Sequence, residues 1–274
     1  MAACARELIA GSGLPLLEAR MLLERALGAS RTWLIAHDDE ALPDAQVAVF
    51  QDWAARRRRG EPMAYLLGER EFMGHLFHVS PAVLIPRPET ELLVETALAH
   101  VRDIPAPRVL DLGTGSGAIA VSIALARPDA RVDATDLSPQ ALEVAGDNAR
   151  RLGAVVALHE GDWYGALNGG AAAPIYDVIV SNPPYIAAGD PHLSQGDLRH
   201  EPGMALTDRA DGLEALRAIV RGAPAWLKPS GALWMEHGWD QAGRVRDLLR
   251  AAGFGGATSR RDLAGIERIS GGSL

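Results

Sequence analysis

The strongest constraint on the fold is a regular alternation of short apolar runs with longer amphipathic segments, which starts at Arg108. The apolar runs predict five strands, at residues 108–112, 131–135, 155–159, 176–181 and 231–236. The other segments predict helices, one after Gly117 and three at residues 138–152, 211–227 and 240–252. Residues 257–272 predict two short antiparallel strands joined by a turn. Because strands that alternate with helices form a parallel sheet covered on both faces, the sequence predicts a doubly wound α/β domain.

The first 75 residues lack this alternation and predict a small helical bundle. Apolar side chains recur at three- and four-residue spacing over residues 16–27, which is typical of an amphipathic helix. Pro15 suits the beginning of this helix and Gly28 suits its end. Two further helices are predicted at residues 32–37 and 44–59.

We place a domain boundary after residue 75, which gives an N-terminal helical domain of residues 1–75 and a second domain of residues 76–274. Glycine turns and spaced apolar residues over 62–87 predict a hairpin-like connector, with 76–87 as its part in the second domain. Pro86 then begins a helix, because proline and acidic residues are favourable in a first helical turn.

Residues 56–59 are four consecutive arginines, for which two interpretations stay open. The first is a helix C-terminus, where cations oppose the negative end of the dipole and Gly60 supplies a left-handed residue. The second is a docking surface for nucleic acid or for a protein partner. The net charge of −8 argues against broad attraction to phosphate backbones, so we favour the first interpretation and expect no direct binding of nucleic acid.

Cysteine usage and hydropathy indicate where the protein works. Cys4 is the only cysteine, so no intrachain disulfide is possible and a cytosolic setting fits. Charges interrupt every apolar stretch before the roughly 18 residues that a membrane span needs. The first twenty residues lack the order of a signal peptide. We therefore expect a soluble, cytoplasmic, monomeric protein that does not contact a membrane.

Asn182-Pro183-Pro184-Tyr185 follows the predicted strand 176–181 and points to the chemistry. Two prolines end a strand, because they remove backbone donors and fix φ, but they build a rigid rim where open α/β sheets bind ligands. The Asn182 side chain and the Pro183 carbonyl offer two acceptors to one planar NH2 group, and Tyr185 offers a flat face behind it. This set suits an amide or the exocyclic amine of a base.

The glycine-rich segment of residues 111–117 follows the first predicted strand of the sheet and opens a helix. Glycines allow a tight turn and a close approach of backbone to ligand. The spacing also fits a dinucleotide fingerprint, so an NAD enzyme is an alternative to an S-adenosylmethionine enzyme. Asp111 favours the latter, because an acid at this position can face a ligand ammonium rather than a pyrophosphate. A glycine turn without a ligand is the weaker interpretation.

Two further acids end the following strands. Asp136 can bind ribose hydroxyls in either class of enzyme. Asp162 stands beside Trp163, on which a flat adenine can lie, although a tryptophan at this position can equally serve packing. Arg87 and Glu89 either line the entrance or form a helix cap and a surface ion pair.

The motifs together resemble the HemK/PrmC family of N5-glutamine methyltransferases. The resemblance covers nearly the whole chain, and the combination of IPRPETE with the later NPPY is its most specific part. One departure is Ile266, where a polar residue is commoner. The matching segments are Gly68, Phe72 with Gly74, residues 83–95, 111–117, Asp136, residues 161–163, 182–185, 201–202, 205–206, 211–213, 236–238 and 262–265.

The resemblance implies a class I methyltransferase domain with a seven-stranded sheet, and an N-terminal helical domain that engages a class 1 peptide chain release factor. The implied reaction is methylation of the glutamine in the Gly-Gly-Gln loop of that factor, with S-adenosylmethionine as methyl donor and S-adenosylhomocysteine as product. The implied catalytic residues are Asn182, Pro183, Pro184 and Tyr185. The implied cofactor-binding residues are Asp111, Gly113, Thr114, Gly115, Ser116, Gly117, Asp136, Asp162, Trp163 and Asn182.

Other chemistries have less support. His75 and His78 lack a completing ligand set, so we predict no metal site. Ser116 and Ser181 lack the G-x-S-x-G elbow of hydrolases. The main rival is a nucleic-acid amino-methyltransferase, which would need a basic groove and a base-reading element. A binding module that keeps the fold without the activity is the second rival, and it disagrees with the complete glycine loop.

Overall fold

A computed structural model describes residues 3–167 and 176–274 of the chain. The chain divides into two compact units, Met1–Glu69 and Arg70–Leu274. The expected division into functional domains after residue 75 stays a prediction. None of the helices in the described ranges combines the length and the apolar character that crossing a bilayer requires.

The N-terminal unit is helical, as the sequence predicts. Its core is formed by apolar residues of α2 and α4 together with Leu34 and Leu66. Gly28 closes α2 in the left-handed conformation, with φ of 63°. The Ser30 side chain accepts a hydrogen bond from the Trp33 N–H and so caps α3. The helices are α1 (Ala5–Gly11), α2 (Leu16–Leu27), α3 (Arg31–Ala36), α4 (Asp44–Arg58) and α5 (Met63–Leu67).

The arginine run lies at the C-terminus of α4, and at least three of its side chains bond within the N-terminal unit. Arg56 pairs with Glu61 at 2.6 Å, and Arg57 pairs with Glu18 at 2.8 Å. Arg58 donates to the carbonyl of Ser12 at 2.6 Å. These contacts support the structural interpretation of the run over a phosphate-binding surface.

The C-terminal unit contains a seven-stranded sheet, which confirms the predicted fold class. The strand order is β5-β4-β3-β6-β7-β9-β8, and β9 pairs antiparallel with both of its neighbours. A two-stranded sheet of β1 and β2 precedes it, within the predicted connector. The strands are β1 (Glu69–Phe72), β2 (His75–His78), β3 (Arg108–Leu112), β4 (Arg131–Asp136), β5 (Val156–Glu160), β6 (Tyr176–Ser181), β7 (Leu227–Glu236), β8 (Gly255–Arg261) and β9 (Glu267–Ser273).

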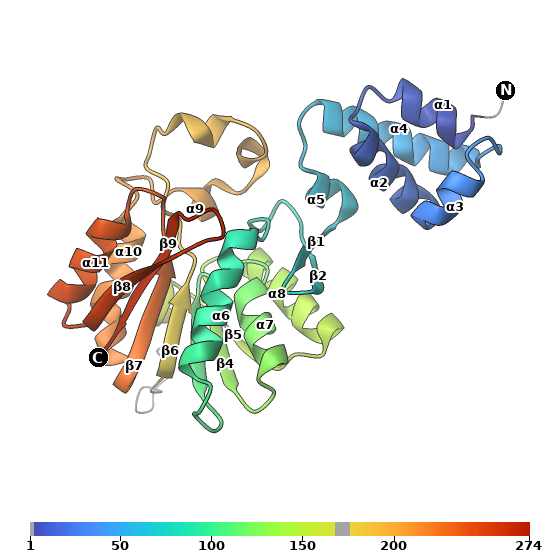
Figure 1. Ribbon diagram of the computed structural model, residues 1–274. Coiled ribbons are helices and arrows are strands. Elements are labelled where there is room, and N and C mark those ends of the chain that lie inside the picture. Colours follow the sequence, from blue (N-terminus) through green and yellow to red (C-terminus); the bar gives the residue numbers. More distant parts are fainter. Residues whose placement is uncertain (1–2, 168–175) are drawn as a thin grey trace. The chain divides into compact units, whose positions relative to one another are not determined.

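Helices cover both faces of the seven-stranded sheet (Figure 1). On one face α6, α7 and α8 pack on side chains such as Val109 and Val178. On the other face α10 and α11 pack on the alternate side chains, such as Leu110 and Ile179. This alternation is the two-residue period of a strand. The helices are α6 (Glu91–His100), α7 (Ala118–Ala126), α8 (Pro139–Leu152), α9 (Gly203–Leu206), α10 (Glu214–Gly222) and α11 (Ala242–Ala251).

Three sequence expectations need correction. The helix expected over 211–227 is shorter, because α10 ends at Gly222 and Pro224 cannot continue its hydrogen bonding. The hairpin-like connector expected over 62–87 contains the helix α5 before its hairpin of β1 and β2. The helix expected from Pro86 begins instead as a 3-10 turn, Pro88–Thr90, which leads directly into α6.

Candidate active site

A pocket lies in the C-terminal unit, at the carboxyl ends of β3, β4 and β6. Open α/β sheets bind ligands at this edge, beside the point where the strand order reverses. Nine residues predicted for the site line it: Gly113, Thr114, Gly115, Ser116, Asp136, Asp162, Trp163, Asn182 and Pro184. Four predicted residues are not part of its lining: Asp111, Gly117, Pro183 and Tyr185.

The glycine loop uses most of its backbone N–H groups inside the protein. Those of Gly113 and Thr114 both donate to the Thr135 carbonyl at 2.9 Å. The Gly115 N–H donates to Asp136 Oδ2 at 2.8 Å, and the Gly117 N–H donates to the Thr114 carbonyl. A pyrophosphate needs such groups to be free. The loop is therefore poorly suited to a dinucleotide.

Two of the loop glycines are required for different reasons. Gly117 has φ of +80°, and a Cβ there would lie 3.1 Å from the Cβ of Ala145, so the glycine lets α7 start against α8. Gly115 has φ of +56° with no atom within 4 Å of a Cβ position, and it lines the pocket. Its missing side chain leaves space that a ligand can occupy.

Asp111 is fully buried beneath the loop. Its Oδ2 accepts a 2.6 Å hydrogen bond from the Thr114 hydroxyl, whereas its Oδ1 has no hydrogen-bond partner among the described residues. Burial raises the pKa of Asp111 to about 7, and the charge of Asp136 acts in the same direction. A buried carboxyl group with an unpaired oxygen is stabilised in its charged form by a nearby cation.

Asp136 ends β4 and fastens the loop to the next helix. Its two carboxylate oxygens accept hydrogen bonds from the N–H groups of Gly115 at 2.8 Å and Ser138 at 2.9 Å. Burial raises the pKa of Asp136 above its ordinary value despite these hydrogen bonds. Trp163 also lines the pocket, and its ring comes within 3.2 Å of a Cβ built on Gly113. The indole thus lies directly over the glycine loop.

Asn182 belongs to a hydrogen-bonded chain of three side chains. Its Nδ2 donates to Thr90 Oγ1 at 3.2 Å, and the Thr90 hydroxyl donates to Glu236 Oε2 at 2.6 Å. The Tyr185 hydroxyl donates to the other oxygen, Glu236 Oε1, at 3.1 Å. Glu236 is only 2% exposed, and burial raises its pKa. Asn182 and Tyr185 are therefore held by one buried carboxyl group.

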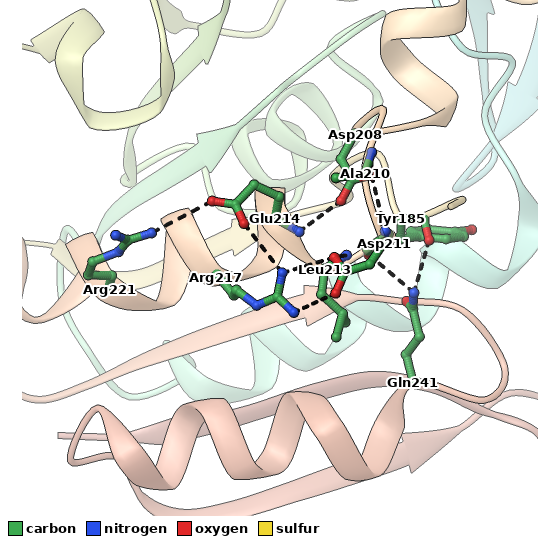
Figure 2. Close-up of polar contacts among 10 residues, drawn as sticks. Tyr185, Asp208, Ala210, Asp211, Leu213, Glu214, Arg217, Arg221 and Gln241 are labelled. Atoms are coloured by element: carbon green, nitrogen blue, oxygen red, sulfur yellow. Dashed lines mark hydrogen bonds and ion pairs between the residues drawn. The ribbon is translucent and has the colours of Figure 1, made fainter. Parts of the chain in front are cut away.

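The backbone of Tyr185 is fixed from a second direction, which Figure 2 shows. Gln241 Nε2 donates to the Tyr185 carbonyl at 2.9 Å and to the Gly212 carbonyl at 3.1 Å. Asp208 folds the adjoining loop by accepting hydrogen bonds from the N–H groups of Ala210, Gly212 and Glu214. A Cβ on Gly212 would lie 2.5 Å from the Tyr185 carbonyl oxygen, so glycine alone permits this approach.

Arg87 and Glu89 differ in their placement. Arg87 lines the pocket and pairs with Glu201, whose side chain is completely buried and also accepts from the Ile85 N–H at 3.0 Å. Glu89 is exposed and is not part of the lining. Within residues 3–167 and 176–274, no three His, Cys, Asp or Glu side chains gather into a group that could hold a metal ion.

The site contains positioning residues that sequence reasoning missed. Thr90 and Glu236 were noted only within matching segments, and Gln241 was not singled out at all. Asp208 likewise carries no motif that predicts its role. The available signal for Glu236 is its place at the end of a strand, where parallel sheets present ligand-binding residues.

The pocket is lined by the half-buried carboxyl group of Asp136, an internally satisfied glycine loop and an indole face, and the buried carboxyl group of Asp111 lies behind this lining. These features suit a cationic ligand with a flat ring rather than an anionic one. With the strand order of the sheet, they define a class I methyltransferase.

Comparison with known proteins identifies the family to which the chain belongs. Residues 3–68 match the model of the PrmC N-terminal domain, and residues 88–196 match that of the methyltransferase small domain. The release factor glutamine methyltransferase of Bordetella pertussis is 64% identical over 269 residues, covering 98% of both chains. That of Neisseria gonorrhoeae is 50% identical over 259 residues, covering 94% of this chain and 93% of the relative. The chain belongs to the release factor glutamine methyltransferase family.

A solved structure confirms the fold alone. The 16S rRNA N2 G1207 methyltransferase of T. thermophilus, in complex with AdoMet and guanosine, is 20% identical. It superimposes with a TM-score of 0.56 and covers 75% of this chain and 49% of its own.

Proposed function

We propose that this protein transfers a methyl group from S-adenosylmethionine to the side-chain amide nitrogen, N5, of the glutamine in the Gly-Gly-Gln motif of peptide chain release factors. The observation that carries this function is a single pocket lined both by the glycine loop and by Asn182 and Pro184. A methyl donor held on the loop and an amide held by the rim therefore meet in one space. The nearly full-length match to release factor glutamine methyltransferases supports the choice of substrate.

The residues present fit the cofactor, which when bound supplies an electrophilic methyl group on a sulfonium sulfur. Gly113, Thr114, Gly115 and Ser116 offer backbone surface to its methionine part. The unpaired oxygen of Asp111 suits an ammonium group, although the residue lies behind the lining. Asp136 suits ribose hydroxyls, because carboxylate oxygens can accept more than one hydrogen bond each. Trp163, beside Asp162, offers its face to the adenine.

The chain's own residues act mainly by orienting the amide. An amide nitrogen is a weak nucleophile, because its lone pair is delocalised into the carbonyl. Asn182 Oδ1 and the Pro183 carbonyl accept its two N–H bonds and direct the lone pair toward the methyl group. Orientation of this kind can supply ~7–11 kcal/mol of the barrier. No strong base is needed before attack, since the nitrogen becomes acidic only as the new bond forms.

The two remaining residues of the rim have supporting roles in this proposal. Pro184 keeps the rim rigid, because its φ is fixed. Tyr185 packs against the substrate amide from a ring whose hydroxyl is already anchored on Glu236. This anchoring leaves the ring little freedom to move away.

The partner is a class 1 release factor, and the helical N-terminal domain, residues 1–75, is the part that engages it. The match of residues 3–68 to the PrmC N-terminal domain supports this assignment. We place the reaction in the cytoplasm, because release factors act on ribosomes there. The enzyme works as a monomer and does not need to bind nucleic acid or a membrane, since its substrate is a protein loop.

The test uses radiolabelled S-adenosylmethionine with three acceptors in parallel: a release factor, the same factor with its loop glutamine replaced by alanine, and duplex DNA. Label on the intact factor alone supports the proposal, and Asn182→Ala is expected to abolish it. Label on DNA would assign the enzyme to the nucleic-acid methyltransferases. Label on the glutamine-free factor would show that a different residue is methylated.

A further inference from the structure

The side-chain amide of Asn182 can present either its oxygen or its NH2 group to the pocket. Only the oxygen can accept an N–H bond of the substrate amide. The two orientations have the same shape, so packing alone hardly distinguishes them. A hydrogen bond that favours one orientation is therefore needed for the proposed function, on which the following inference rests.

We propose that Thr90 and Glu236 are positioning residues that fix the Asn182 amide with Oδ1 available to the substrate. The three residues come from different segments: Thr90 ends the 3-10 turn before α6, Asn182 follows β6, and Glu236 ends β7. Their contacts join residues 92 and 146 positions apart.

The direction of each hydrogen bond follows from the chemistry of the groups. A threonine hydroxyl has one proton, and Glu236 accepts one hydrogen bond at each of its two carboxyl oxygens, from Thr90 and from Tyr185. The short contact of 2.6 Å between Thr90 Oγ1 and Glu236 Oε2 therefore uses the hydroxyl proton. Thr90 Oγ1 is left with lone pairs, so it accepts from the Asn182 NH2 group at 3.2 Å.

The reverse orientation of the amide is disfavoured by the same chain. It would place Asn182 Oδ1 against the lone pairs of Thr90, so a hydrogen bond would be lost and two acceptors would face each other. In the observed orientation no described residue hydrogen-bonds to Oδ1, and Asn182 lines the pocket. This oxygen is the acceptor that the substrate meets.

Burial makes this hydrogen-bonded chain of side chains rigid. Thr90 is 4% exposed and Glu236 is 2% exposed, and the second carboxylate oxygen is occupied by the Tyr185 hydroxyl. Glu236 therefore links both polar residues of the rim, Asn182 and Tyr185, to one fixed point at the end of β7.

The test compares Thr90→Val, which removes the hydroxyl at constant shape, with Thr90→Ser, which keeps it. The matched control is Thr96→Val, at a threonine that is 1% exposed, lies on α6 and donates to none of these residues. With saturating release factor and S-adenosylmethionine, Thr90→Val is expected to lower kcat about 10- to 100-fold, because buried polar groups lose their hydrogen-bond partner. The KM for the release factor and the affinity for S-adenosylmethionine should stay within about threefold, because those contacts are made elsewhere.

Thr90→Ser and Thr96→Val are expected to keep kcat within about threefold of the wild type, since both retain the chain. Glu236→Leu, which removes both acceptor oxygens, should match Thr90→Val, and the double variant should be no worse than either single one, because both break one chain of hydrogen bonds. Thermal unfolding identifies any variant that fails to fold. If Thr90→Val unfolds, the inference is overturned by a threefold or larger loss of kcat in the serine variant, or by full activity of a folded Glu236→Leu variant.

Full activity of Thr90→Val overturns it as well. The activity of the wild type shows whether the positioning role or the proposed function itself has been refuted. A wild-type enzyme that does not methylate the release factor refutes the function, whereas an active wild type with an equally active Thr90→Val refutes only the positioning role.

Discussion

Gly115 offers a direct test of where the cofactor lies, because an alanine there adds one methyl group to the pocket. Gly115 has φ of +56°, and no protein atom lies within 4 Å of its Cβ position. Gly153, at the end of α8, provides a matched control. It has φ of +79°, equally free surroundings and an exposed position outside the pocket.

The two alanine variants should be destabilised to a similar degree. A left-handed conformation costs an alanine about 1–2 kcal/mol. The alanine also restricts the unfolded chain, which offsets about 0.4–1 kcal/mol of that cost. The net loss is about 1 kcal/mol, which lowers the Tm by about 2–4 °C in a unit the size of Arg70–Leu274.

Only Gly115→Ala should weaken cofactor binding. Isothermal titration calorimetry with S-adenosylmethionine is expected to show an affinity at least about tenfold lower for Gly115→Ala, which corresponds to about 1.4 kcal/mol. Gly153→Ala should bind within about twofold of the wild type. Wild-type affinity in both variants would show that the ligand does not approach Gly115. An equal loss in both would show that strain anywhere in the unit weakens binding.

Two further predictions concern the core of the C-terminal unit. Burial raises the pKa of Asp111 to about 7 from the ordinary 3.8, so the stability that its proton contributes is full below pH 3.8 and is lost as the pH rises through about 7. Without cofactor, the Tm of Asp111→Asn minus the Tm of the wild type should therefore increase from pH 5 to pH 8. The variant should also bind S-adenosylmethionine more weakly. Parallel curves of Tm against pH would contradict the pKa argument. Gly271→Ala should lose about 1–3 kcal/mol of stability in urea unfolding, because its Cβ would lie 2.4 Å from the Leu233 carbonyl oxygen. Gly243→Ala, at an exposed position of α11, should instead gain roughly 0.5 kcal/mol, and equal effects would refute the packing argument.

Local patterns in the sequence were enough to predict the fold class and much of the pocket. The strand predicted at residues 176–181 is β6, and the glycines at 113, 115 and 117 all adopt positive φ. These predictions succeed because strand periodicity and glycine conformation depend mainly on neighbouring residues. The end of α10 was predicted less well, although Pro224 was a visible local signal.

The pairing of distant residues could not be derived in this way. Sequence alone placed Asn182 on the rim and Glu236 at the end of a strand, but gave no reason to join them through Thr90. Only the folded sheet sets β6 beside β7 and brings the turn before α6 to the same edge. Hydrogen bonds between such segments leave no periodic trace, because each depends on strand order and on the direction of single side chains. The sequence by itself therefore determined the class of fold and the chemistry of the rim, whereas the tertiary structure decided which buried groups hold that rim in place.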